Sequence, residues 1–299
     1  MPSRNAEPIM TNTVGKSRHF KTSDGVTLHY LEAGSGSPLV MIPGWSQSAE
    51  QFKFQIKGLS DRSHCIAVDM RGHGESDKVN FGYKIQRLAK DVHEILTGLG
   101  LNEVALLGHS MGCSVIWCYW DLFGSDRVSK LILADQPPFV TSNPAWDAEE
   151  LEAAGALMDI DAVVKMCNAL AGPDGHATTV DYINRLVSSS MSDKEKAWII
   201  RRNLRLPRQH AATLLYNSSS QDWRDVIPRI NIPTLVVGGK ASFIPWKSQV
   251  WVHRQIPDSQ IVLFEEDEGG YHFMFIEGAA KFNQALVDFL ALSPKVSIE

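Results

Sequence analysis

Short apolar runs alternate with helical patterns in the first and last thirds of the chain. Two alternating runs flank Ser23-Asp24-Gly25 within residues 18–33, which predicts a hairpin. Buried strands are predicted at 39–42, 65–68, 104–107, 128–134, 234–237 and 260–264. Helical spacing is found at 85–99, 113–123, 248–255 and 279–292. This alternation predicts an α/β fold with a mostly parallel central sheet flanked by helices.

The middle of the chain has a different pattern. Helical periodicity is found near 147–158, 161–170, 178–190 and 193–204, with no good strand between them. We therefore expect an inserted helical cap at 141–228 and one core formed by 18–140 together with 229–299. The polar residues 1–17 lack the apolar centre of a signal peptide and are expected to form a flexible tail.

Composition narrows the class of protein. The 299 residues are 44% hydrophobic and 21% charged, with a net charge of −5, which argues against nucleic-acid or anionic-membrane partners. No segment has the roughly 18 consecutive apolar residues of a membrane span. The four cysteines form no C-x-x-C pair, so we expect reduced thiols and a cytoplasmic protein. A small-molecule substrate is the expected partner, and a homo-oligomer is possible.

A G-x-S-x-G pentapeptide follows the predicted strand at 104–107. It reads Gly108-His109-Ser110-Met111-Gly112 and runs directly into the predicted helix at 113–123. Two glycines allow a sharp turn without a Cβ clash, and the start of the helix presents free N–H groups and a partial positive charge. A serine held exposed at such a turn has the geometry of a nucleophile elbow.

Four segments together resemble the α/β-hydrolase fold family over residues 18–295. They are Pro43-Gly44-Trp45, Asp69-Met70-Arg71-Gly72-His73-Gly74-Glu75-Ser76, the pentapeptide around Ser110, and Gly269-Gly270-Tyr271-His272-Phe273. The resemblance implies the fold but not one reaction, because this fold supports many chemistries. It also implies that His272 lies over the elbow as the base that activates Ser110.

The acid that should orient His272 is less obvious. In most members of the family it lies where this chain has Ser242. Some members place it after the preceding core strand, which makes Asp135 the candidate, although an aspartate before two prolines could simply cap a turn. Asp222, Asp225 and Asp267 are rivals.

Two further groups complete the expected site. The amide of Met111, with that of Trp45 or Ser46, is expected to form the oxyanion hole. Pro43 has no N–H and is excluded. The substrate pocket is expected to be apolar and partly aromatic, formed by His109, Phe139, Trp146, Met158, Trp246 and Phe273.

The leading hypothesis is hydrolysis of a carboxylic ester or lactone through an acyl-enzyme, without a metal or organic cofactor. Part of the chain also resembles the cofactor-free dioxygenases that cleave 3-hydroxy-4-quinolones, through Pro43-Gly44-Trp45, Phe81-Gly82-Tyr83 and residues 91–96. Those enzymes use a His–Asp dyad, but they carry histidines where this chain has Gln47 and Met111. A non-catalytic ligand-binding protein is the third alternative. Ser110 disfavours haloalkane dehalogenation and epoxide hydrolysis, which use aspartate at the elbow.

Overall fold

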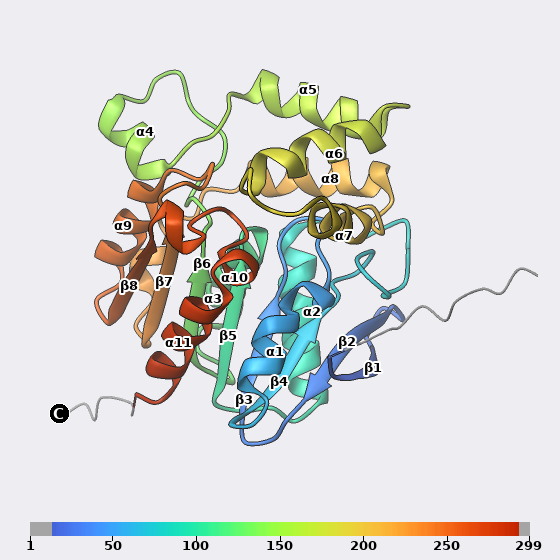
Figure 1. The fold of residues 1–299 in the computed structure, drawn as a ribbon, viewed down its shortest axis with the longest axis vertical. Coiled ribbons are helices and arrows are strands. Elements are labelled where there is room, and N and C mark those ends of the chain that lie inside the picture. The colour runs from blue at the N-terminus through green and yellow to red at the C-terminus, as the bar shows by residue number, and fades with distance from the viewer. Residues whose placement is uncertain (1–13, 293–299) are drawn as a thin grey trace, which may run out of the picture.

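The computed structural model describes residues 14–292, and its strands form one eight-stranded sheet (Figure 1). The sheet order is β1-β2-β4-β3-β5-β6-β7-β8. The strands are β1 (Lys16–Lys21), β2 (Thr27–Ala33), β3 (Ser37–Ile42), β4 (Ser63–Val68), β5 (Val104–His109), β6 (Val128–Ala134), β7 (Thr234–Gly239) and β8 (Ser259–Phe264).

The sheet is parallel from β4 through β8 and antiparallel at the β1–β2 edge. The predicted hairpin is formed by β1 and β2, which turn at Gly25 with a φ of 87°. Its first strand begins at Lys16, inside the segment expected to be a tail, while residues 1–13 of that segment lie outside the described part of the chain. The expected mostly parallel, helix-flanked sheet is confirmed.

Helices cover both faces of the sheet (Figure 1). One face carries α2 (Ile85–Gly98), α3 (Met111–Phe123) and α9 (Trp246–Gln255), and the other carries α1 (Lys53–Leu59), α10 (Met274–Glu277) and α11 (Ala279–Leu290). Three 3-10 turns lie at Ala49–Phe52, Ile227–Arg229 and Glu266–Glu268. Alternate residues of the central strands point to opposite faces, so the sheet separates two apolar cores.

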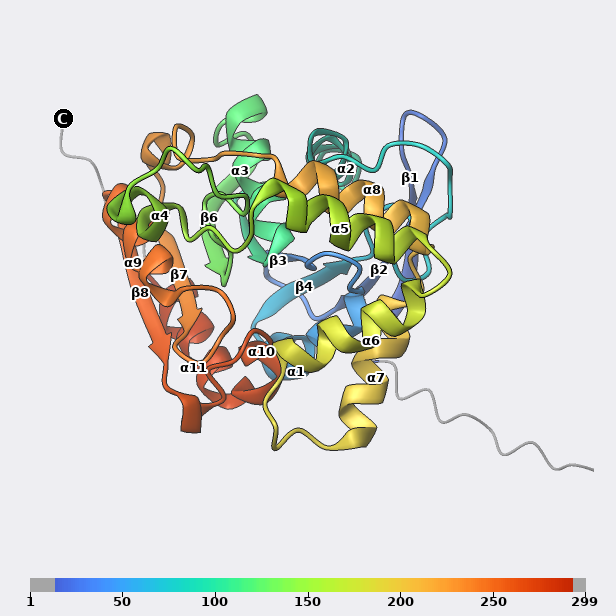
Figure 2. The same cartoon turned by 90° about the horizontal axis from the view of Figure 1, so that it is seen from above.

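Five helices lie between β6 and β7, and α5 to α8 extend over the carboxyl ends of the central strands (Figures 1 and 2). They are α4 (Ala148–Ala154), α5 (Ile160–Ala171), α6 (Gly175–Leu186), α7 (Asp193–Asn203) and α8 (Arg208–Ser219). Helix α4 ends earlier than its periodicity suggested because Gly155 adopts the left-handed conformation with a φ of 64°. Helix α8 was not anticipated as a separate element.

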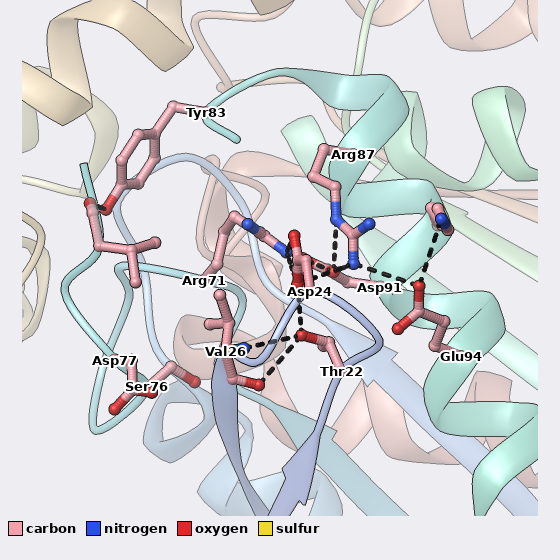
Figure 3. Close-up of polar contacts among 12 residues, drawn as sticks. Thr22, Asp24, Val26, Arg71, Ser76, Asp77, Tyr83, Arg87, Asp91 and Glu94 are labelled. Carbon is pink, nitrogen blue, oxygen red and sulfur yellow. Dashed lines mark hydrogen bonds and ion pairs between the residues drawn. The ribbon is translucent and has the colours of Figure 1, made fainter. Parts of the chain in front are cut away.

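A buried ion network ties the first hairpin to α2 (Figure 3). Arg71 Nε lies 2.7 Å from Asp91 Oδ2, and Arg71 Nη2 lies 3.0 Å from Asp24 Oδ2. Arg87 also contacts Asp91 at 2.7 Å. Arg71 therefore holds the hairpin turn against α2, so this residue of the Asp69–Ser76 segment has a structural role.

The four cysteines are buried and unpaired. Within residues 14–292, no helix combines the length and apolar character needed to cross a membrane.

Candidate active site

Ser110 is held in a strained conformation between β5 and α3. Its φ of 53° and ψ of −127° lie in a region that side chains other than glycine rarely adopt. A Cβ on Gly108 would lie 2.6 Å from the Gly112 backbone, and one on Gly112 would lie 2.3 Å from the Ile42 carbonyl oxygen. Both glycines are therefore required for the close approach of α3 to β5 and β3. Met111 begins α3, so its N–H has no intrahelical acceptor.

The imidazole of His272 is held by the carboxylate of Asp135. His272 Nδ1 lies 2.7 Å from Asp135 Oδ2, and both side chains are almost fully buried. Asp135 follows β6 with a φ of 57°, and its side chain contacts His272 in the loop after β8. The His272 amide donates to the Leu186 carbonyl at 3.2 Å, so the same loop also contacts the end of α6.

Asp135 has two additional donors. The Ser242 hydroxyl donates to Asp135 Oδ2 at 2.5 Å, and the Gly239 amide approaches Oδ1 at 3.4 Å. Ser242, at the position where the acid was first expected, thus donates a hydrogen bond to the candidate acid Asp135. The other candidate acids, Asp222, Asp225 and Asp267, are exposed, whereas Asp135 and His272 are buried. Asp222 pairs with Arg224 and Asp225 with Arg229.

Burial affects the pKa values of the pair in opposite directions. Desolvation lowers the pKa of His272 and raises that of Asp135, because the charged form of each group loses hydration. The hydrogen bond from Ser242 opposes the increase at Asp135. The His272 imidazole is therefore held neutral at neutral pH, which leaves Nε2 able to accept a proton when Nδ1 donates to Asp135.

Ser110 and His272 line the same small cavity, of about 10 Å³. Within the described residues, the Ser110 hydroxyl has no hydrogen-bond partner, and none is formed with His272. Such bonds are often long without substrate and shorten in the complex. Ser110 and His272 therefore meet at one cavity without a preformed bond between them.

The turn after β3 carries two expected oxyanion donors, the amides of Trp45 and Ser46, and their hydrogen bonds differ. The Gln47 amide donates to the Gly44 carbonyl at 3.2 Å, and Ser46 has a φ of 61°, as in a type II turn. The Ser46 amide donates to His73 Nε2 at 3.1 Å, and its hydroxyl donates to the Asn203 carbonyl at 2.6 Å. Both groups of Ser46 are thus engaged, which leaves the Trp45 amide as the candidate from this loop.

The expected pocket residues separate into two groups. His109 and Phe273 lie under His272: the His109 Nε2 donates to the His272 carbonyl at 2.8 Å, and the Phe273 ring packs 5.6 Å from that of His109. Both are fully buried and do not line the cavity at Ser110. They contact His272 from the buried side of the loop.

The remaining expected pocket residues, Phe139, Trp146, Met158 and Trp246, do not line this cavity either. Phe139 and Trp146 pack against each other at 5.5 Å, with Arg224 stacked on Trp146. Trp246 lines a separate surface cavity beside α4.

The cavity wall opposite Ser110 comes instead from residues that sequence patterns did not single out. Tyr182, Ile183 and Leu186 come from α6, and Asn203 ends α7. The Tyr182 ring packs edge-on to Trp45 at 5.6 Å and to Phe243 at 6.2 Å, and Phe243 lies 4.9 Å from His272. The helical period at 178–190 indicated that a buried face exists here, but not which part of the core it covers.

No group of three histidine, cysteine, aspartate or glutamate side chains is arranged to hold a metal ion within residues 14–292.

Comparisons with known proteins agree with this architecture. A family described as the alpha/beta hydrolase fold matches residues 37–158. The "AB hydrolase superfamily protein YisY" of Bacillus subtilis is 28% identical over 91% of this chain and 98% of its own. A "putative non-heme chloroperoxidase" of Synechocystis is 28% identical over 93% and 98%.

Among solved structures, an esterase from Exiguobacterium antarcticum is similar with a TM-score of 0.84 and 26% identity, covering 93% of this chain and 100% of its own. Relatives named for different reactions thus share one architecture, as is usual for this fold. Sheet order, elbow and matched family model together show that the chain has the α/β-hydrolase fold.

Proposed function

We propose that the protein hydrolyses a carboxylic ester or lactone, with Ser110 as nucleophile, His272 as general base and Asp135 as the orienting acid. The observation that carries the proposal is the 2.7 Å contact between His272 Nδ1 and Asp135 Oδ2, with His272 and Ser110 lining one cavity. This arrangement supports the assignment of a Ser-His-Asp triad.

The proposed reaction proceeds in two halves. His272 Nε2 takes the Ser110 hydroxyl proton as Oγ bonds to the substrate carbonyl carbon, and the carbonyl oxygen becomes an oxyanion. The amides of Met111 and Trp45 stabilise that charge. The intermediate then collapses, the carbon–oxygen bond breaks, and the leaving alkoxide takes the proton from His272. In a lactone this alcohol stays attached to the acyl group.

Water completes the cycle. His272 removes a proton from water as its oxygen attacks the acyl-enzyme, and the second tetrahedral intermediate releases the carboxylic acid while returning the proton to Ser110. Asp135 holds the imidazole in the tautomer with a proton on Nδ1 and stabilises the imidazolium formed in each half. A neutral histidine is needed at the start of both steps, which fits the direction in which burial moves its pKa.

Residues 141–228 are proposed to act as the cap over this site. The side chains that α6 presents to the cavity include Ile183 and Leu186, which favour an apolar portion of substrate. With a cavity of only about 10 Å³, a substrate must displace these side chains to reach Ser110.

A covalent trap tests the mechanism. A serine-directed fluorophosphonate should add once to the wild-type protein at Ser110, and an activated aryl ester should give a burst of phenol. Ser110→Ala should abolish both, whereas Ser125→Ala, at an exposed serine beyond the far end of α3, should change neither. Full ester turnover by Ser110→Ala would overturn the proposal, and oxygen consumption with a 3-hydroxy-4-quinolone would replace it with dioxygenation.

A further inference from the structure

One residue that lines the Ser110 cavity has a side-chain polar atom without a hydrogen-bond partner. Asn203 is fully buried and lines the cavity together with Ser110 and His272. Its Oδ1 accepts no hydrogen bond from any residue in the described part of the chain. Several other buried polar atoms are likewise unpaired, but within residues 14–292 Asn203 is the only one of these residues that lines this cavity.

The orientation of the Asn203 amide is determined by its surroundings. Nδ2 donates to the Ile199 carbonyl at 3.0 Å, one turn back along α7. Rotation of the amide would place Oδ1 against that carbonyl, bringing two acceptors together and losing the bond. Oδ1 therefore lies on the side of the amide away from Ile199, and it can accept but not donate.

The backbone of Asn203 is anchored to the loop that carries Trp45. Its carbonyl oxygen accepts from the Ser46 hydroxyl at 2.6 Å and from Arg208 Nη2 at 2.5 Å. Arg208 also donates to Ser46 Oγ and to Thr179 Oγ1, each at 2.8 Å. This half-buried guanidinium donates to hydroxyl and carbonyl oxygens, and it fixes Asn203 relative to the candidate oxyanion donor.

A buried carbonyl oxygen without a donor is unfavourable, whereas a ligand that supplies the donor gains a hydrogen bond in a desolvated site. We infer that Asn203 Oδ1 is a specificity determinant that accepts a hydrogen bond from a hydroxyl or amide N–H group of the substrate. The inference rests on the proposed hydrolase function for its substrate class, an ester or lactone bearing such a donor close to its carbonyl. Asn203 then selects substrates that the apolar residues Ile183 and Leu186 alone would not distinguish.

Matched esters test the inference through binding alone. In the Ser110→Ala background, calorimetry compares ethyl 2-hydroxy-2-phenylacetate with its 2-methoxy ether, which places the donor in the acyl part. It also compares 2-hydroxyethyl with 2-methoxyethyl phenylacetate, which places the donor in the alcohol part. We expect at least one hydroxyl ester to bind about tenfold or more tightly than its methyl ether.

Variants assign that preference to the amide. Asn203→Leu, or Asn203→Ala if the leucine variant does not fold, should remove the preference and leave the methyl ethers little changed. Ile183→Val, which alters the cavity wall without changing a polar group, should keep it. Equal binding within both pairs, or a preference that survives both Asn203 substitutions, would overturn the inference. Turnover of the same esters by the wild-type protein is measured separately, so a failure of the proposed hydrolysis is distinguished from a failure of this inference.

Discussion

Ser242 and His272 bind the same oxygen of Asp135. The Ser242 hydroxyl lies 2.5 Å and His272 Nδ1 lies 2.7 Å from Oδ2. The chain thus keeps a side chain at the usual position of the acid but uses it as a hydrogen-bond donor to a carboxylate on the neighbouring strand. The two strands concerned, β6 and β7, are adjacent and parallel, which brings their carboxyl ends together.

The proposed role of Asp135 can be tested by moving the carboxylate from position 135 to position 242. Asp135→Asn is expected to lower kcat by about 10⁴-fold, because an amide does not stabilise the imidazolium and favours the wrong tautomer. Ser242→Asp in the Asp135→Asn background should recover part of that loss. Ser242→Ala is the control, and it should retain most activity because the carboxylate remains. Steady-state kinetics on one ester decide the matter, and a negligible effect of Asp135→Asn would remove Asp135 from the proposed triad.

The pH profile should reflect the burial of His272. Burial moves its pKa downward from the usual 6.5, and in the proposed mechanism the neutral imidazole is the base. Activity should therefore be constant around neutral pH and fall only as the pH drops through the lowered pKa. We expect the acid limb of kcat/KM to have its midpoint below pH 6.5. A midpoint at or above that value would show that the charge of Asp135 outweighs desolvation.

Shortening the cavity wall should enlarge the site at a cost in stability. Leu186→Ala removes a buried side chain opposite Ser110 and is expected to lower the free energy of unfolding by about 2 to 5 kcal/mol. It should also raise the ratio of kcat/KM for a long-chain ester to that for an acetate. Leu286→Ala, in α11 on the far side of the core, is the matched control. It should destabilise the protein without changing that ratio, and the same change in both variants would contradict a role for Leu186 in the site.

The ion network of Figure 3 should behave as a coupled unit. Asp91→Ala leaves the guanidinium of Arg71 buried without its closest partner, and should lower the free energy of unfolding by about 3 to 5 kcal/mol. The double variant Arg71→Met, Asp91→Leu should recover much of this loss because both fully buried charges are removed, while the partly exposed Asp24 and Arg87 still pair with each other. Urea denaturation measures both. Additive losses in the double variant would show that the pair is not coupled.

Much of the fold could be predicted because it depends on local patterns. The runs at 104–107 and 128–134 are buried on both faces and therefore lack alternation, as in a parallel sheet. The end of α4 was predicted less well, because Gly155 stops a helix whose periodicity continues beyond it. The separate helix α8 follows Pro207 closely after α7, and its weakly amphipathic sequence gave little signal.

The candidate site could be predicted only in part, for a physical reason. Ser110, Asp135 and His272 follow strand ends, so their convergence follows from the parallel sheet. The wall formed by Tyr182, Leu186 and Asn203 depends on how α6 and α7 pack over the core, which no local pattern specifies. Composition pointed instead to tryptophans such as Trp146, which packs under Arg224 away from the cavity.

Trp45 connects helix α8 to the proposed oxyanion hole. Its indole Nε1 donates to the Ala211 carbonyl of α8 at 2.8 Å, while its backbone amide is the candidate oxyanion donor. A displacement of α8 wide enough to admit substrate would pull on the same residue that must later stabilise the oxyanion. If substrate entry needs such a displacement, the Trp45 amide is out of place while the site is open, and the site becomes reactive only after α8 has returned.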